Sequence, residues 1–412
     1  MRTGLASAAR IPHATGSWLL ALAVGCALPA CGPAAGTERP STSIVACVAL
    51  PADRLGTVDG VPVREGGYSG LAFDEAGGLW ALTDRGPNLE AERAAGRPAK
   101  RFPVPDYHPH AQRLTLDSAG VTLSDVLAFG TATGDLATGY PPPATDPALT
   151  VELALDADFR DDGHDAEGID SEGIAFGGGS LWVGDEYRPS VWRLDPQTGR
   201  LLARYTPTPS HPLDRPLPTW LLQRRPNLGF EGLAWRNDYL FAALQGPLSP
   251  PGGDAYTPLT RILRLDPATG DARAFAYALE GPARKIGDLA VHPDGRLLVL
   301  EHGERPGGRW SAEVYAVDLA RVGYLAADAL PPERFRDLAS ALAAGVAVAP
   351  KTLHVDLLAA GYPPRLRKPE GLAVDPAGRL VVINDNDFGL DSPRGTGSAV
   401  ATGVATELFV ID

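Results

Sequence analysis

The sequence predicts an all-β fold, a β-propeller of five to six four-stranded blades with a short helical insertion. Three observations lead to this prediction. A short phrase recurs five times, each copy is followed by a turn and a second apolar run, and further apolar runs follow several of these pairs. Four antiparallel strands repeated along a chain are typical of propeller blades.

The recurring phrase predicts the first strand of each blade, and the run after it predicts the second strand. The five copies are Ser69–Phe73, Glu172–Phe176, Glu231–Trp235, Asp288–Val291 and Glu370–Val374. The second runs are Leu79–Arg85, Leu181–Glu186, Leu240–Gln245, Leu297–Glu301 and Leu380–Asn386. Residues that favour tight turns, above all Gly, Asn, Asp and Pro, separate the two runs, so each pair is expected to form a β-hairpin.

The outer strands and the closure of the ring are predicted from weaker runs. Third strands are expected at Val191–Asp195, Ile262–Asp266, Val314–Asp318 and Leu408–Asp412, and fourth strands at Leu201–Tyr205 and Ala272–Tyr277. The last blade is expected to take its fourth strand from Ile44–Leu50, which would remove free sheet edges. Leu338–Ala344 predicts the helical insertion, and a Pro- and Asp-rich stretch after the first copy predicts a long loop. A solenoid fits less well, because the copies are irregularly spaced.

The N-terminal residues predict export. Arg2 and Arg10 precede an apolar stretch, Trp18–Leu28, which is the order found in signal peptides. Leu28-Pro29-Ala30-Cys31 resembles a bacterial lipobox, so Cys31 is a candidate for lipidation, with ordinary signal cleavage elsewhere as the alternative. The expected organisation is a signal peptide over 1–30, a flexible tether over 31–43 and a propeller domain over 44–412.

Composition limits the partners of the chain. Its formal net charge is −13 at pH 7, and loss of a leader with two Arg makes it more negative. This acidity argues against nucleic acid or an anionic membrane as a partner. We expect a monomer that binds a small-molecule substrate and meets a membrane only through an N-terminal lipid. It would be a periplasmic or cell-surface lipoprotein, or otherwise a secreted protein.

The polar ends of the paired runs predict a metal site. The start of the first strand of a hairpin lies beside the end of its second strand, so these ends should gather at one mouth of the propeller. The candidate metal ligands are Asp84, Glu172, Glu186, Glu231, Asp288, Glu370, Asp385 and Asn386. Crowded carboxylates repel one another unless a cation neutralises them, and oxygen ligands suit Ca²⁺ better than other divalent ions. The alternative is that these acids cap strands and bind backbone amides.

Cationic and catalytic candidates lie close to the acids in sequence. The candidate substrate-binding residues are Arg85, Arg188, Lys285, Arg305 and Lys368, which could hold an oxyanion beside the metal. The catalytic candidates are Glu231, Glu301 and His302, with His302 as a general base or simply a hydrogen-bonding residue. His164 is a second, weaker candidate. The sequence contains no Gly-x-Ser-x-Gly elbow, no His-Glu-x-x-His motif and no P-loop.

These motifs resemble the phytase-like family, also described as the esterase-like activity of phytase domain, a propeller group found mainly in exported bacterial proteins. The resemblance rests on Ser69–Phe73 with Thr83–Gly86, Glu172–Ala175 with Asp185–Tyr187, Phe230–Ala234 with Leu244–Leu248, Leu298–Glu301, and Glu370–Ala373 with Asn384–Phe388. It extends from about Gly66 to Asp412 and implies a calcium-supported hydrolase of phosphate esters or related esters. The chain departs from the pattern at Ser69-Gly70, which lacks the acid, and at Gly287-Asp288.

Other functions remain open. One is a calcium-dependent lactonase, and another is a non-catalytic lipoprotein whose propeller mouth binds a ligand or partner. Family membership does not establish turnover, because one fold supports many functions. Sugar dehydrogenation with a quinone cofactor ranks last, because no residue specifically indicates a quinone site.

Overall fold

The computed structural model describes residues 42–94, 97–117, 120–143, 152–326 and 329–412. The predicted signal peptide, the lipidation candidate Cys31 and nearly all of the tether lie outside the described residues. None of the helices in these ranges is both long enough and apolar enough to cross a membrane.

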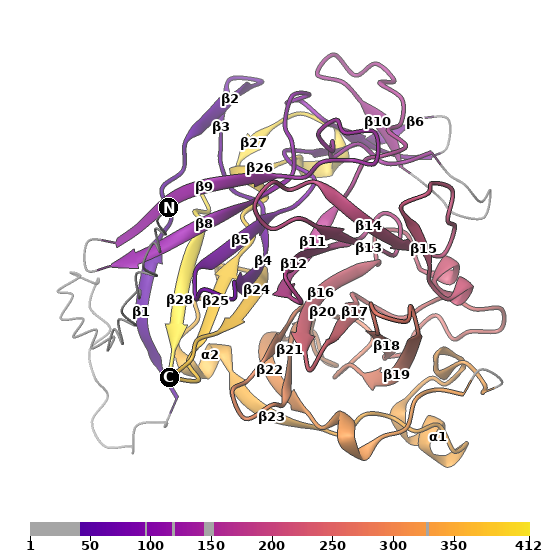
Figure 1. Cartoon of the computed structure of the whole chain (residues 1–412). Coiled ribbons are helices and arrows are strands. Elements are labelled where there is room, and N and C mark those ends of the chain that lie inside the picture. The colour runs from indigo at the N-terminus through magenta and orange to yellow at the C-terminus, as the bar shows by residue number, and fades with distance from the viewer. Residues whose placement is uncertain (1–41, 95–96, 118–119, 144–151, 327–328) are drawn as a thin grey trace, which may run out of the picture.

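Five sheets follow one another along the chain, each with four antiparallel strands (Figure 1). From its first strand outward, the first sheet consists of β4 (Tyr68–Phe73), β5 (Leu79–Thr83), β8 (His110–Asp117) and β9 (Gly120–Ala128). The second sheet consists of β11 (Ser171–Gly177), β12 (Ser180–Asp185), β13 (Ser190–Leu194) and β14 (Leu201–Thr206). The third sheet consists of β16 (Phe230–Arg236), β17 (Tyr239–Leu244), β18 (Leu259–Leu265) and β19 (Ala272–Ala278). The last two are β20 (Arg284–Val291), β21 (Leu297–Glu304), β22 (Trp310–Val317) and β23 (Lys351–Asp356); and β24 (Pro369–Val374), β25 (Leu380–Asn384), β28 (Glu407–Ile411) and β1 (Ile44–Ala49). The second sheet carries a fifth, parallel strand, β15 (Asp214–Pro216).

The glycine of the recurring phrase allows the first strands of neighbouring sheets to pass very close to one another. A Cβ on Gly173 would lie 2.7 Å from the carbonyl oxygen of Glu231, and one on Gly232 would lie 2.5 Å from the amide nitrogen of Leu289. Such contacts run from β4 to β11, β16, β20 and β24, and then from β24 back to β4. The five first strands therefore surround a common axis in a propeller-like arrangement, and glycine is needed because a side chain would fill the gap.

The fourth sheet carries Asp288 where the other copies have glycine. Asp288 pairs with Leu300, as Gly232 pairs with Ala243 in the third sheet. Its carboxylate accepts hydrogen bonds from the amides of Leu372 at 2.7 Å, Leu289 at 2.7 Å and Leu71 at 3.4 Å. This side chain therefore connects the fourth sheet to the fifth and first sheets at the axis.

The closing strand and the helix lie where the sequence predicts them. β1 pairs antiparallel with β28, so the fifth sheet contains the first strand of the chain, and that prediction is confirmed. The helical insertion is α1 (Leu338–Ala343), and a side-chain oxygen of Asp337 accepts the amide of Ser340 at its N-terminus. The remaining helical turns are α2 (Leu357–Ala360), η1 (Thr219–Gln223), η2 (Leu319–Arg321), η3 (Pro332–Arg334), η4 (Asp387–Gly389) and η5 (Pro393–Gly395).

Three small sheets extend from one end of the ring. They are β6 (Leu89–Ala94), β7 (Arg97–Arg101) and β10 (Leu153–Leu155); β2 (Arg54–Val58) and β3 (Val61–Arg64); and β26 (Leu390–Asp391) and β27 (Val400–Ala401). They contact one another through β3 and β27 and through β6 and β26, at the top of Figure 1. Since β6 follows the end of β5 and β26 follows the end of β25, these sheets lie at the end where the second strands finish.

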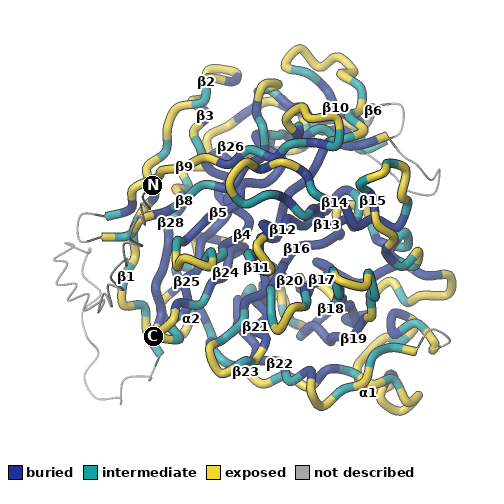
Figure 2. Tube along the Cα trace, in the orientation of Figure 1, coloured by how far each residue is buried: buried dark blue, intermediate teal, exposed yellow. Residues whose placement is uncertain are grey.

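The hydrophobic core lies between neighbouring sheets. Figure 2 shows that the strands around the axis are buried, while exposed residues concentrate on the outer connections. Trp182 of the second sheet stacks on Trp235 of the third with ring centroids 5.6 Å apart. Packing between successive sheets stabilises the ring, because each sheet buries both of its faces against its neighbours.

Candidate functional site

A β-bulge recurs at the start of the first strands and determines where the acid of the phrase points. The ladder register shifts between Phe230 and Gly232 and between Pro369 and Gly371, so Glu231 and Glu370 are the bulged residues. The β11 ladder is also irregular there, at Glu172. A bulge redirects a side chain away from the regular alternation of a strand. These acids lie at the end of the ring from which the small sheets extend.

We call this end of the ring the mouth. Its charged residues come from the bulges, from the ends of the second strands, and from residues at or just before the start of the first strands. They are Asp84, Arg85, Asp170, Glu172, Glu186, Glu231, Lys285, His302, Lys368, Glu370 and Asp385. The two lysines are partly exposed, and every other member is buried. Most of the candidate metal ligands from the sequence are therefore in this cluster.

Three acids of the mouth could hold one metal ion. Carboxylate oxygens of Asp170, Glu172 and Glu186 all lie within 4.8 Å of one another. Both carboxylate oxygens of Asp170 and Oε1 of Glu186 are buried without a hydrogen-bond partner among the described residues. Arg85 Nη1 lies 3.1 Å from Asp170 Oδ2, without the geometry of a hydrogen bond. We call Asp170, Glu172 and Glu186 the acid trio.

Asp170 was not among the metal ligands predicted from the sequence. It stands two residues before Glu172, and alternate residues of an extended segment point to the same side. The two-residue spacing from Glu172 could have indicated that Asp170 points into the same site. Arg188, which the sequence proposed for substrate binding, instead donates to the carbonyl oxygens of Ala166 and Gly168 at 2.7 and 2.9 Å. It therefore supports the segment that carries Asp170.

Glu172, Glu186 and Glu231 lie in an environment that favours their protonated forms. Burial, together with the nearby charges of Asp170 and Glu231, raises the pKa of Glu172 well above its usual range. Burial raises the pKa of Glu186 in the same way. Burial also raises the pKa of Glu231 to about 8, and Glu231 Oε2 is enclosed without a partner within the described ranges. Neutralisation by a cation would remove this cost.

The opposite side of the mouth pairs acids with lysines. Lys285 Nζ donates to Glu370 Oε1 at 3.0 Å, and Lys368 Nζ donates to Asp385 Oδ2 at 2.7 Å and to Asp387 Oδ1 at 2.6 Å. Burial opposes ionisation of Glu370, but Lys285 and Lys368 outweigh it and hold its pKa well below the usual range. Glu370 is therefore a carboxylate, while burial and Asp387 raise the pKa of Asp385 to about 7.

His302 lies on this lysine side and is neutral at physiological pH. Burial and the charge of Lys285 lower its pKa to about 3. Its Nε2 is 3.8 Å from Glu370 Oε1 and has no hydrogen-bond partner in the part of the chain that the structure describes. A neutral imidazole with a free ring nitrogen can accept or donate a proton, depending on its tautomer.

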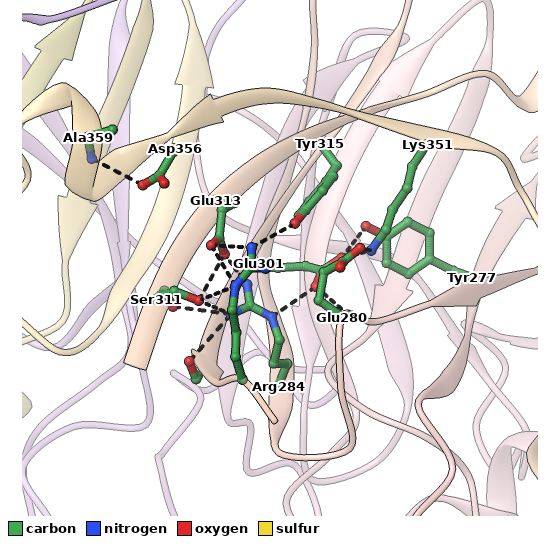
Figure 3. Close-up of polar contacts among 12 residues, drawn as sticks. Tyr277, Glu280, Arg284, Glu301, Ser311, Glu313, Tyr315, Lys351, Asp356 and Ala359 are labelled. Atoms are coloured by element: carbon green, nitrogen blue, oxygen red, sulfur yellow. Dashed lines mark hydrogen bonds and ion pairs between the residues drawn. The ribbon is translucent and has the colours of Figure 1, made fainter. Parts of the chain in front are cut away.

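Glu301 precedes His302 in β21 but belongs to a different cluster, drawn in Figure 3. It accepts from Tyr277 Oη at 2.6 Å and from Arg284 Nε at 3.2 Å. Consecutive residues of a strand point to opposite faces, which explains why only His302 reaches the mouth. Arg305 also lies in this cluster, where its Nη2 is 2.6 Å from Glu313 Oε1.

The cluster in Figure 3 balances its own charge. Each of its three glutamates forms an ion pair with at least one of three bases, and these residues are Glu280, Glu301, Glu313, Arg284, Arg305 and Lys351. The mouth is different, because seven carboxylates there face three cationic side chains: Asp84, Asp170, Glu172, Glu186, Glu231, Glu370 and Asp385 against Arg85, Lys285 and Lys368. An excess of buried carboxyl groups over cationic side chains, with oxygen-only donors, fits a bound Ca²⁺.

Three further candidates from the sequence bind backbone groups. The Asp288 carboxylate accepts hydrogen bonds from three backbone amides at the axis and does not belong to the acid trio. Asn386 accepts the amide of Gly67 at 3.1 Å and donates to the carbonyl oxygen of Val404 at 3.2 Å. Asp84 Oδ1 accepts the amide of Gly86 at 2.7 Å. These contacts correspond to the alternative weighed for the acids, in which they support the backbone.

Comparison with known families gives one match. A family described as phytase-like, with the esterase-like activity of phytase, matches residues 63–388. A search of curated proteins found no match.

Solved structures give only distant likenesses. Glutaminyl cyclase of Myxococcus xanthus is 12% identical with a TM-score of 0.36, covering 90% of this chain and 97% of that chain. The PQQ-bound form of aldose sugar dehydrogenase from Streptomyces coelicolor is 14% identical with a TM-score of 0.34, covering 90% of this chain and 98% of that chain. Likenesses at this level carry no argument about this chain.

Proposed function

Since the chain belongs to the phytase-like family, the family of the esterase-like activity of phytase, we propose that it hydrolyses phosphate esters or related esters at the mouth, assisted by Ca²⁺. The observation that carries the proposal is the excess of buried carboxylates at the mouth, with oxygens of Asp170 and Glu186 left without hydrogen-bond partners among the described residues. Around Glu301, by contrast, buried acids of the same chain pair with bases.

The acid trio would hold the cation. A divalent ion bound there would polarise the ester oxygen and assist ionisation of water. The trio is buried beside Arg85, whose Nη1 is also 2.6 Å from Glu152 Oε1. These contacts orient Arg85 and leave the remaining oxygens of the trio for the cation.

The other residues of the mouth would bind the substrate and move protons. Lys285 and Lys368 present partly exposed ammonium groups that attract an anionic substrate. We assign His302 Nε2 to accept a hydrogen bond from the attacking water and to orient it beside the Glu370 carboxylate, 3.8 Å away. The proton of the water would pass to solvent, because a pKa of about 3 makes His302 a weak base. Glu231 keeps its proton near neutral pH and would donate it to the leaving oxygen as the ester bond breaks. Glu231 and Glu370 therefore differ in protonation near neutral pH, because the pKa of Glu231 is raised and that of Glu370 is lowered. Such a difference suits two carboxyl groups to opposite roles.

An ester panel with and without calcium tests the proposal. The purified protein is assayed on p-nitrophenyl phosphate, phytate, p-nitrophenyl acetate and simple lactones, in EDTA and in Ca²⁺. We expect turnover of esters that requires calcium and falls about 100-fold or more in Glu186→Gln, because the trio then loses a ligand. Glu333→Gln is the matched control, since Glu333 is equally buried but pairs with Arg261 away from the mouth.

The outcomes of the panel distinguish an ester hydrolase from a lactonase and from a binding protein. Preference for lactones would indicate a lactonase, and calcium binding without turnover of any substrate would indicate a binding protein. Turnover that is equal in EDTA and in calcium would contradict the role of the cation.

The proposal also extends to architecture and location. We propose that the five sheets are the five blades of a propeller, with the closing strand β1 completing the last one. We also propose that the chain is exported and anchored through Cys31. Incorporation of labelled palmitate in a bacterial host should disappear in Cys31→Ala and persist in Cys26→Ala.

A further inference from the structure

Arg224 is a buried guanidinium without an acidic partner. Its side chain is 9% exposed, and no carboxylate among the described residues forms an ion pair with it. Its Nη1 donates to the carbonyl oxygen of its neighbour Arg225 at 3.1 Å, while its enclosed Nε has no partner in the described ranges. Burial of a charge without a partner is costly, so this arrangement requires an explanation.

The other buried arginines of the described chain all have acidic partners. The pairs are Arg85–Glu152, Arg101–Asp59, Arg204–Asp214, Arg261–Glu333 and Arg284–Glu301. Arg224 therefore departs from a consistent pattern within this chain. A guanidinium that is kept buried and unpaired is available to an anion that comes from outside the chain.

The connection that begins at Arg224 packs against the acid trio. Arg224 directly follows η1 and begins the connection that leads to β16. Further along this connection, Asn227 Oδ1 accepts from Arg85 Nη2 at 3.1 Å. A Cβ on Gly229 would lie 2.3 Å from the carbonyl oxygen of Glu186, so the connection packs directly against the trio. Glu186 and Asp170 are among the charges that act on Arg224.

We propose that Arg224 binds an oxyanion of the substrate at the mouth, next to the acid trio. This inference rests on the proposed function and adds a substrate class to it, namely esters that carry an anionic group. A guanidinium presents several N–H donors in a plane and matches carboxylate, sulfate and phosphate oxygens alike. Lys285 and Lys368 differ from Arg224, because each already contacts a carboxylate of the mouth.

Arg224 also affects the binding of the cation. Its positive charge lies close enough to Glu186 and Asp170 to oppose Ca²⁺ at the trio, and an oxyanion on Arg224 removes that opposition. Binding of the oxyanion and of calcium should therefore be mutually reinforcing, and this coupling is necessarily reciprocal.

Inorganic sulfate and phosphate serve as probes in calorimetric titrations and thermal melts of the purified full chain, in EDTA and in Ca²⁺. The variants are Arg224→Gln, Arg224→Lys and the control Arg225→Gln. Arg225 donates to the carbonyl oxygens of Asp254 and Ala255. We expect both anions to stabilise the wild type and Arg225→Gln. Arg224→Gln should bind them about tenfold or more weakly, because it loses the charged donors that hold the oxyanion.

Arg224→Lys keeps the charge without the planar donors, so we expect an intermediate loss. This variant also answers the question if Arg224→Gln does not fold. Equal anion binding by the wild type and Arg224→Lys would overturn the inference, and so would undiminished anion binding by a folded Arg224→Gln. So would the absence of any anion binding by the wild type.

A second readout separates this inference from the proposed function. Arg224→Gln should keep the stabilisation by calcium, and in the absence of anions it should bind calcium more tightly. Its KM for p-nitrophenyl phosphate should rise, while its kinetics on the neutral p-nitrophenyl acetate stay close to those of the wild type. If calcium does not stabilise the wild type, the cation site is rejected, while the measured anion binding still tests the role of Arg224.

Discussion

Asp288 accepts a hydrogen bond from the backbone amide of Leu372 at 2.7 Å, and this bond joins the fourth sheet to the fifth at the axis. The sequence shows Gly287-Asp288 as an irregular copy of the phrase, and it suggested Asp288 as a metal ligand. In the structure the aspartate occupies the glycine position, and its carboxylate bonds to three amides. The irregular copy thus supplies a cross-link that a glycine could not supply.

Replacing Asp288 with Ala should lower the free energy of unfolding by about 1–3 kcal/mol, because the buried amides of Leu372 and Leu71 lose their acceptor. Urea unfolding would measure this change. Glu304→Ala, at an exposed position of the same sheet, should change stability by less than about 0.5 kcal/mol. Unchanged stability in Asp288→Ala would contradict a cross-linking role.

Replacing Gly232 with Ala should destabilise the ring by about 1–3 kcal/mol, because the new methyl group would lie 2.5 Å from the amide nitrogen of Leu289. Thermal melts would show the loss. Gly323→Ala is the control, since a Cβ at Gly323 meets no atom within 4 Å. If both variants melt at the same temperature, the close approach of the inner strands is not what requires glycine.

Metal-free protein should become less stable as pH rises from about 4 to about 8. In the unfolded chain Glu231 and Asp385 ionise near their ordinary pKa values, whereas burial raises their pKa values in the folded state to about 8 and about 7. The folded state therefore binds more protons across this window, so its stability falls as pH rises. Urea unfolding in EDTA at several pH values would measure the slope.

Glu231→Gln should reduce this slope, because the substituted side chain no longer titrates. Added Ca²⁺ should stabilise the protein more at pH 8 than at pH 5, since the cation displaces protons from the mouth. A stability that is constant or rises with pH in EDTA would show that the buried acids are not protonated.

His302→Gln should lower kcat by about 100-fold or more if His302 orients the attacking water. Stabilisation by calcium should persist, because His302 contacts the Glu370 side of the mouth and not the trio. The pH–rate profile of the wild type should lack a histidine ionisation between pH 5 and 8, because the pKa of His302 is lowered to about 3. His354→Gln, a partly buried histidine elsewhere, is the control and should keep full activity.

The sequence allowed much of the fold to be predicted, because the phrase and its turns repeat with a clear pattern. The hairpins, the pairing of Ile44–Ala49 with the last strand and the helix at Leu338–Ala343 all follow from it. The small sheets were missed. Their strands are short and polar, as in Leu89–Ala94 and Arg97–Arg101, and lack the alternation that indicates a strand.

The site was less predictable, because strand register decides which side chains meet. Glu301 and His302 are adjacent in sequence, yet one joins the cluster of Figure 3 and the other joins the mouth. The bulges at Glu231 and Glu370 redirect single residues, and no composition signal places a bulge. Arg224 gives no signal in the sequence, since its significance comes from the absence of an acidic partner for its side chain among the described residues.

The pairing of β1 with β28 also has a consequence for biosynthesis. Cys47 faces Phe409 across this pair, so the first and last strands of the fifth sheet come from distant parts of the chain. During translation β1 emerges early and must wait for β28 before the ring can close. The nascent chain therefore exposes an unpaired strand edge for most of its synthesis, and such edges favour aggregation and slow folding.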